Sequence, residues 1–126
     1  MIASYHAHIY YRTPAERTKA EQLRAQIPER FLVRLGSWHD VPVGPHTAPM
    51  FQLAFRADIF ADLIPWLMLN RNGLAILLHP NTGRVRDDHL INPFWFGEIV
   101  PVKADILPEV SDEAMEIEPN TTPRIK

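Results

Sequence analysis

The chain has 126 residues, a formal net charge of −2, 46% hydrophobic side chains and no cysteine, which fits one domain that can bury a hydrophobic core. The near-neutral charge without a large basic cluster argues against nucleic acid as a partner, and the absence of cysteine excludes disulfides and thiolate zinc sites and fits a reducing cytoplasm. We expect no signal peptide and no membrane span, because no basic segment precedes an apolar run and no apolar stretch is long enough.

The first half of the chain predicts a strand, a helix and two more strands. Residues 4–12 are rich in Tyr and Ile with a rough alternation, which is typical of a strand. Thr13, Pro14 and Glu16 form a capping box that begins a helix, and Pro28 is expected to end it. Two further strands are predicted over residues 31–38 and 50–56, with a proline-rich loop over 40–49 between them.

The second half continues with a helix and a strand. The helix is expected within 58–72, with Asp58 or Asp62 as its cap. We favour Asp62, because Pro65 then falls in the first turn, where its missing N–H matters little. An almost wholly apolar strand follows over 74–79. This order predicts an α+β fold, the ferredoxin-like βαββαβ antiparallel sheet with both helices on one face.

The end of the chain differs in composition from the rest. Residues 105–118 carry six acidic side chains and no basic one. We therefore predict a domain over residues 1–104 and an acidic, loosely ordered tail over 105–126. A solvated tail is favoured over an arm that binds a partner.

The six histidines are the residues with the clearest chemical meaning, since imidazole is the commonest neutral metal ligand. In the predicted fold, the first and third strands are expected to lie side by side and parallel, flanked by the fourth and the second. This arrangement would bring all six to one end of the sheet: His6, His8, His39, His46, His79 and His89.

The alternation of the first strand predicts which face carries these groups. Successive side chains of a strand point to opposite faces, so Ala7 and the residues in step with it should meet the helices. His6, His8 and Tyr10 are left on the open face, which must be covered. The tail, residues 80–100 or a second subunit could cover it, and in the last case the protein would be a homodimer with a dimeric α+β barrel.

Each histidine also has an ordinary structural interpretation, so the prediction depends on the set. His39 fits a turn residue that pairs with Asp40, and His46 fits a surface loop between two prolines. His79 could be a hydrogen-bonded residue at the end of a buried strand, and His89 a solvated loop residue after two aspartates.

Two segments near these histidines could bind a substrate. Residues 80–83 form a tight turn by composition, which would place Thr82 and Arg84 near the mouth of a site, where an arginine could bind a carboxylate. The aromatic run over 92–97, which includes Trp95, fits a core more often than a binding wall.

Several short motifs, in this order and spacing, resemble the DOPA 4,5-dioxygenase family of fungi and bacteria, over residues 4–103. They are His6-Ala7-His8-Ile9-Tyr10-Tyr11, Gly36-Ser37-Trp38-His39, Pro42-Val43-Gly44-Pro45-His46, Leu77-Leu78-His79-Pro80-Asn81-Thr82-Gly83 and Asp88-His89 with Trp95-Phe96-Gly97.

This resemblance implies a ferredoxin-like domain that cleaves catechols such as DOPA in the extradiol manner with O₂ and non-haem Fe(II), which zinc could replace in a crystal. The resemblance places the histidines in the active site, and the residue patterns above supply the substrate contacts; a carboxylate ligand from Asp40, Asp87, Asp88 or Glu98 stays open. The metal ligands are His6, His8 and His79; the catalytic residues are His89 and His46; the substrate contacts are Tyr10, Thr82, Arg84 and Trp95.

Two other functions remain open at this point. The first is a dimeric module that binds a metal or a small ligand without turnover. The second is an oxygenase of the dimeric α+β barrel kind that needs no cofactor.

Overall fold

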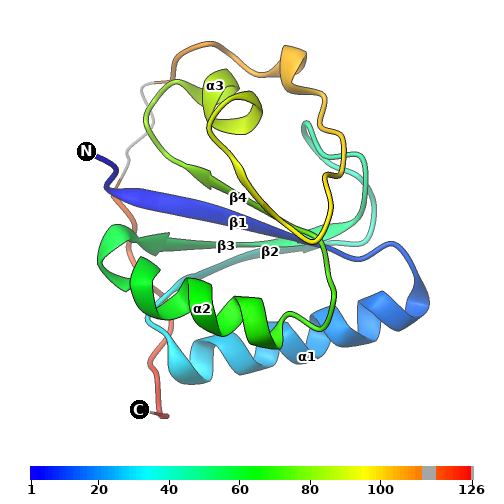
Figure 1. Ribbon diagram of the computed structural model, residues 1–126, viewed down its shortest axis with the longest axis vertical. Helices are drawn as coiled ribbons and strands as arrows, with labels where there is room; N and C mark the ends of the chain where they lie inside the picture. Colours follow the sequence, from blue (N-terminus) through cyan, green and yellow to red (C-terminus); the bar gives the residue numbers. More distant parts are fainter. Residues whose placement is uncertain (112–115, 126) are drawn as a thin grey trace.

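The computed structural model describes residues 1–111 and 116–125. Its centre is a five-stranded antiparallel sheet in the order β2-β3-β1-β4-β5, with α1 and α2 packed on one face (Figure 1). This confirms the predicted α+β fold with both long helices on one face. The elements are β1 (Ser4–Tyr10), α1 (Pro14–Arg30), β2 (Arg34–His39), β3 (Met50–Arg56), η1 (Ala57–Ile59), α2 (Phe60–Asn70), β4 (Ile76–Pro80), α3 (Val85–Leu90), β5 (Phe94–Phe96) and η2 (Ala104–Ile106).

The directions of the strands correct one part of the prediction. β1 is antiparallel to both of its neighbours, and His6 lies opposite Ala54 in β3 and opposite His79 in β4. The expected parallel pairing of the first and third strands is wrong, because α1 returns the chain to make β2 parallel to β1, and β3 then turns back against β2. The start of β1 therefore lies beside the ends of β3 and β4, whereas His39 lies at the other end of the sheet.

The long helices differ slightly from their predicted limits. Thr13 caps α1 by accepting the backbone N–H of Glu16 at 3.1 Å, as predicted, but Pro28 lies inside the helix, which continues to Arg30. α2 begins at Phe60, directly after η1 and without a side-chain cap, so the predicted cap at Asp62 is wrong. No helix among the described residues combines the length and the hydropathy that a membrane crossing requires.

The main core lies between the sheet and the two long helices. Alternate residues of β1, β3 and β4 point into it, which confirms that the Ala7 face of the first strand meets the helices. His6, His8 and Tyr10 are left on the other face. Fully buried members of this core include Ala7, Ile9, Ala20, Leu23, Ile27, Phe51, Leu53, Phe55, Leu63, Leu67 and Ile76.

Segments of the same chain cover the open face of the sheet. α3 and the loop between β2 and β3 both lie on this side (Figure 1). The loop is held by a bridge between His46 and Val102, above a second, smaller core cluster that includes Tyr10, Met50 and Leu77. Of the possible covers considered above, residues 80–100 therefore contribute α3. The same segment also forms β5, which extends the sheet beside β4; neither element was predicted.

The described residues 116–125 of the acidic tail run beside β2 and α1. The Asn120 side chain accepts the backbone N–H of Leu35 at 2.8 Å and donates to its carbonyl at 3.1 Å, and Arg124 forms an ion pair with Glu29 at 2.6 Å. These contacts show where this segment lies. Its loose ordering stays a prediction.

Candidate metal centre

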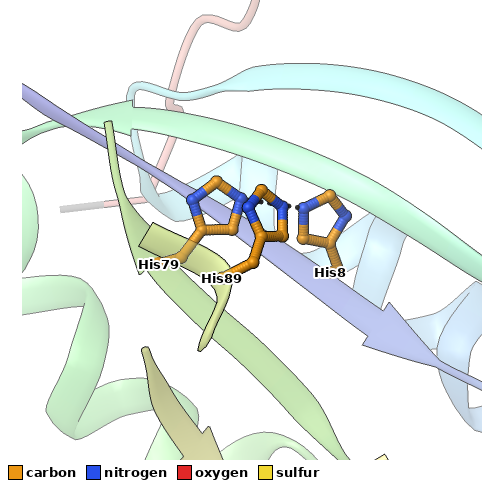
Figure 2. A group of neighbouring side chains, drawn as sticks. All are labelled: His8, His79 and His89. Carbon is orange, nitrogen blue, oxygen red and sulfur yellow. Dashed lines mark hydrogen bonds between the residues drawn. The ribbon is translucent and has the colours of Figure 1, made fainter. Parts of the chain in front are cut away.

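Three histidines from three elements face one another above the open side of the sheet. His8 comes from β1, His79 from β4 and His89 from α3, and Figure 2 shows their rings side by side. All three are buried, and their ligand nitrogens lie within 4.8 Å of one another. Nε2 of His8 lies 3.2 Å from Nε2 of His79. The pairing of β1 with β4 brings two of these rings together, and α3 adds the third.

Backbone hydrogen bonds define which nitrogen carries the proton in two of these rings. His79 Nδ1 lies 2.9 Å from the carbonyl oxygen of Pro80, and His89 Nδ1 lies 2.8 Å from that of Val85. Because a carbonyl only accepts, Nδ1 is the donor in both rings and Nε2 keeps its lone pair. Carbonyls orient metal-binding histidines in the same way. His8 Nδ1 is buried without a hydrogen-bond partner among the described residues.

Burial keeps all the histidines around this site neutral at ordinary pH. Desolvation lowers the pKa of His8, His79 and His89, and the neighbouring imidazoles lower that of His8 and His79 further. Burial also lowers the pKa of His6 and of His46 to about 4. Neutral imidazole is the form that binds metals, so the lone pairs are available without a change of protonation.

The geometry of the three rings fits a divalent transition metal. Two nitrogen ligands that each lie about 2.1 Å from one ion, at tetrahedral or octahedral angles, are separated by about 3.0–3.4 Å. The separation of 3.2 Å between the Nε2 atoms of His8 and His79 falls in this range. Imidazole ligands suit iron, zinc, copper and nickel. These three buried histidines could therefore hold a metal ion, and their side chains do not select one of these metals.

His6 and His46 flank this group from different directions. The ring centre of His6 lies 5.3 Å from that of His79, and His6 lines the cavity described below. The ring centre of His46 lies 4.2 Å from that of His8, and its Nδ1 is hydrogen-bonded to the Tyr10 hydroxyl at 2.7 Å. The sequence predicted His6 as the third ligand and His89 as a catalytic residue, whereas the structure groups His89 with His8 and His79.

His39 does not join the other five histidines, so the predicted convergence of all six is wrong for this residue. It ends β2, at the opposite end of the sheet from His6, and its backbone carbonyl accepts the Tyr11 hydroxyl at 2.8 Å. Its expected partner Asp40 is bound instead by Arg17, at 3.0 Å and 3.1 Å, and by the indole N–H of Trp38 at 2.9 Å. The antiparallel direction of β3 accounts for this difference.

A cavity of about 390 Å³ opens over the three histidines, and His6, Gln52, Asn81 and Ile117 also line it. The four predicted substrate contacts are absent from its described lining. The Tyr10 ring is buried in the second core cluster on the open face and stacks on Trp95, with ring centres 6.1 Å apart. Arg84 is exposed and pairs with Asp87 at 3.4 Å, and Thr82 is bonded to Asp88.

Asp88 is a buried carboxylate beside His89 that holds the preceding turn in place. One of its oxygens accepts the Thr82 hydroxyl at 2.6 Å, and the other accepts the Thr82 backbone N–H at 2.9 Å. The sequence offered this residue only as one of four possible carboxylate ligands. Its position next to His89 was visible in the sequence, but its bond to Thr82 depends on the fold of α3 against the turn.

Replacing Asp88 with alanine should destabilise the protein by about 2–3 kcal/mol, because a buried charged acceptor and two hydrogen bonds are lost. Thermal and urea unfolding of the chelator-treated protein would measure this change. The matched control is Asp87→Ala, which removes only an exposed ion pair with Arg84 and should change stability by less than about 0.5 kcal/mol. Equal effects of the two substitutions would contradict the role given to Asp88.

The lowered pKa values predict a loss of stability in acid. Below pH 6.5 the unfolded chain binds protons at His6 and His46, whereas the folded chain does not until about pH 4. The free energy of unfolding should therefore fall as the pH falls through this window, by roughly 2–4 kcal/mol between pH 6.5 and pH 5. Urea unfolding with a chelator present would measure it. His46→Gln should make the free energy of unfolding depend less on pH in this window. A free energy of unfolding that stays constant down to pH 5 would contradict the lowered pKa values of His6 and His46.

The chain is similar to two curated fungal proteins. The chain is 32% identical over 122 residues to a DOPA 4,5-dioxygenase of Amanita muscaria, across 89% of this chain and 53% of that protein. It is 34% identical over 101 residues to an uncharacterized 21.2 kDa protein of Botryotinia fuckeliana, across 74% of this chain and 54% of that protein. The chain thus spans about half the length of the curated relatives it matches.

A solved structure and a family model add to these matches. The crystal structure of a Nostoc punctiforme protein assigned as a dioxygenase has a TM-score of 0.81 and 43% sequence identity, across 84% of this chain and 91% of that chain. The model of the Dopa 4,5-dioxygenase family matches residues 5–106, a range that includes His8, His79 and His89. Because this match covers most of the chain, the protein belongs to the Dopa 4,5-dioxygenase family.

Proposed function

We propose that this protein is a metal-dependent extradiol dioxygenase that opens the ring of a catechol such as DOPA with O₂. The observation that carries the proposal is a group of three neutral, buried imidazoles, with ligand nitrogens within 4.8 Å of one another, that lines a cavity of about 390 Å³. Its family and its likeness to a protein assigned as a dioxygenase support the same reaction class.

In this proposal His8, His79 and His89 would hold Fe(II), and Nε2 is the nitrogen that His79 and His89 offer to it. The bound metal supplies a Lewis acid for the catechol oxygens and a route for electrons between the ring and oxygen. The backbone carbonyls of Pro80 and Val85 keep two of the rings in the tautomer that presents Nε2. His89 replaces His6 in the proposed ligand set because it belongs to the group of three whose ligand nitrogens lie within 4.8 Å of one another.

His6 then has the position of the acid/base residue. It is neutral, and it lines the cavity together with His79 and Asn81. A neutral imidazole at this place can take a proton from a catechol hydroxyl and return it later in the reaction. His46, which packs against His8 and is bonded to Tyr10, is proposed to position His8 rather than to exchange protons with the substrate.

One experiment separates this function from its alternatives. The purified protein is loaded anaerobically with Fe(II), a catechol is added and air is admitted, while oxygen consumption and visible absorbance are recorded. A dioxygenase consumes one O₂ per ring and yields a coloured ring-opened product, and a chelator stops it. Tight metal binding without oxygen uptake would indicate a binding module, and uptake that survives chelation would indicate a cofactor-free oxygenase.

The homodimer and the cytoplasmic location predicted from the sequence belong to the same proposal. Segments of the same chain already cover the histidines, so the site does not require a second subunit as its cover. Sedimentation of the metal-loaded protein would measure the oligomeric state.

A further inference from the structure

A second cavity adjoins the histidine cavity on the open face of the sheet. Its volume is about 440 Å³, and His6, Gln52 and Ile117 line both cavities. We call it the tail cavity, because the acidic tail forms one of its walls. Its other lining residues come from β2, β3 and this tail: Arg34, Gly36, Ala54, Glu116 and Glu118. The proposed reaction gives none of these five a role.

A row of directly opposed residues connects the tail cavity with the metal centre. His79 in β4 lies opposite His6 in β1, which lies opposite Ala54 in β3, which lies opposite Arg34 in β2. Neighbouring strands are about 4.8 Å apart, so Arg34 starts about 10 Å from His6 along this row. The small side chain of Ala54, which lies between them, leaves cavity space above this part of the sheet. This span is comparable with that of an aromatic ring that carries a short side chain.

Gly36 and Gln52 lie at or near the wall that the two cavities share. A Cβ atom at Gly36 would lie 3.0 Å from the backbone oxygen of Gln52, so a larger residue would press on β3 at this point. The Gln52 side chain lines both cavities and has no hydrogen-bond partner among the described residues. It is directly opposite His8, which places its amide beside the metal centre.

The charges of the tail cavity include both signs. Arg34 uses one N–H to donate to the backbone carbonyl of Glu118 at 3.2 Å, and it forms no ion pair within the part of the chain that the structure describes. A guanidinium has five N–H donors, so a bidentate pair with a carboxylate remains available. Glu116 and Glu118 also line the cavity. They would repel a ligand that carried only a carboxylate, and they would attract an ammonium group.

We propose that the tail cavity binds the zwitterionic amino acid head group of the catechol substrate, with Arg34 on its carboxylate and Glu116 and Glu118 around its ammonium. Arg34 is then the residue that determines specificity for the substrate side chain. This inference rests on the proposed function of the histidine cavity, since the head group is placed relative to a ring bound there.

The test compares Arg34→Met with the wild type on four catechols: L-DOPA, 3-(3,4-dihydroxyphenyl)propanoate, dopamine and 4-methylcatechol. The substitution should lower kcat/KM roughly tenfold to a hundredfold for the two substrates with a carboxylate, mainly through KM, and leave the other two unchanged. Arg56→Met is the matched control, because it removes an exposed arginine that pairs with Asp58 outside both cavities. Calorimetric titration of the metal-free protein with L-DOPA, without oxygen, gives a second measure of binding.

The double variant Glu116→Gln with Glu118→Gln tests the proposed ammonium contacts and changes no residue of the sheet. It should weaken the binding of L-DOPA and dopamine, and it should strengthen the binding of the propanoate, because the repulsion of its carboxylate is removed. An equal loss on all four catechols, or no preference of the wild type for L-DOPA over 4-methylcatechol, would overturn the head-group site while the dioxygenase stands. A wild type that binds L-DOPA tightly through Arg34 but turns over no catechol would overturn the dioxygenase and keep the head-group site.

Discussion

Replacement of His89 with alanine should abolish stable metal binding and, with it, all oxygen consumption that depends on catechol. His89 contributes one of three ligand nitrogens that lie within 4.8 Å of one another, and two imidazoles in an open cavity hold a divalent ion weakly. Loss of a residue that only supports a ligand weakens metal affinity about 10–100-fold, so loss of the ligand should exceed this range. Metal content after gel filtration and titration with Co(II) would measure the change.

The same measurement decides between two ligand sets. His39→Ala is the matched control, because His39 lies at the far end of the sheet, and it should keep the full metal content. His6→Ala should also retain metal if the grouping of His8, His79 and His89 is correct. A His6→Ala variant without metal, beside a His89→Ala variant that retains it, would show that the ligand set expected from the sequence is the right one.

Much of the fold follows from local signals in the sequence. The capping box at Thr13, the alternation of β1 and the apolar run of β4 each predict their element, because these signals depend on residues close together in the chain. The alternation of β1 also predicts its buried face. Strand direction is different. It depends on how the connections return the chain to the sheet. Because β3 was predicted to run parallel to β1, His39 was expected at the same end of the sheet as His6, and it lies at the opposite end.

The site shows the same division between local and long-range information. His8 was predictable from strand periodicity, and His79 from its place at the end of an apolar strand. His89 was placed in a loop, because α3 has only six residues and is held by the bond between Asp88 and Thr82, which is a tertiary contact. The tail cavity was hidden for a similar reason. Composition indicated a solvated tail, and the approach of Glu116 and Glu118 to β2 depends on the folded chain.

Replacement of His6 with alanine should lower kcat about 10²–10⁴-fold, the range of a lost general acid/base, while metal content stays at the wild-type level. His6 faces the cavity beside His79 with a lone pair that burial keeps unprotonated, so its removal takes away the group that accepts the catechol proton. KM should change little, because proton transfer contributes to the transition state rather than to binding. Steady-state rates, normalised to bound iron, would measure the loss.

His6→Gln separates proton transfer from packing in this prediction. Glutamine fills part of the same space and can hydrogen-bond to Asn81, but it does not act as a base near neutral pH, so it should be as slow as alanine. Its stability should remain close to that of the wild type, because His6 lies on the open face outside the main core. Full turnover by His6→Gln with a normal iron content would show that His6 is not the acid/base residue. His46, whose ring centre lies 4.2 Å from that of His8, would then be the next candidate.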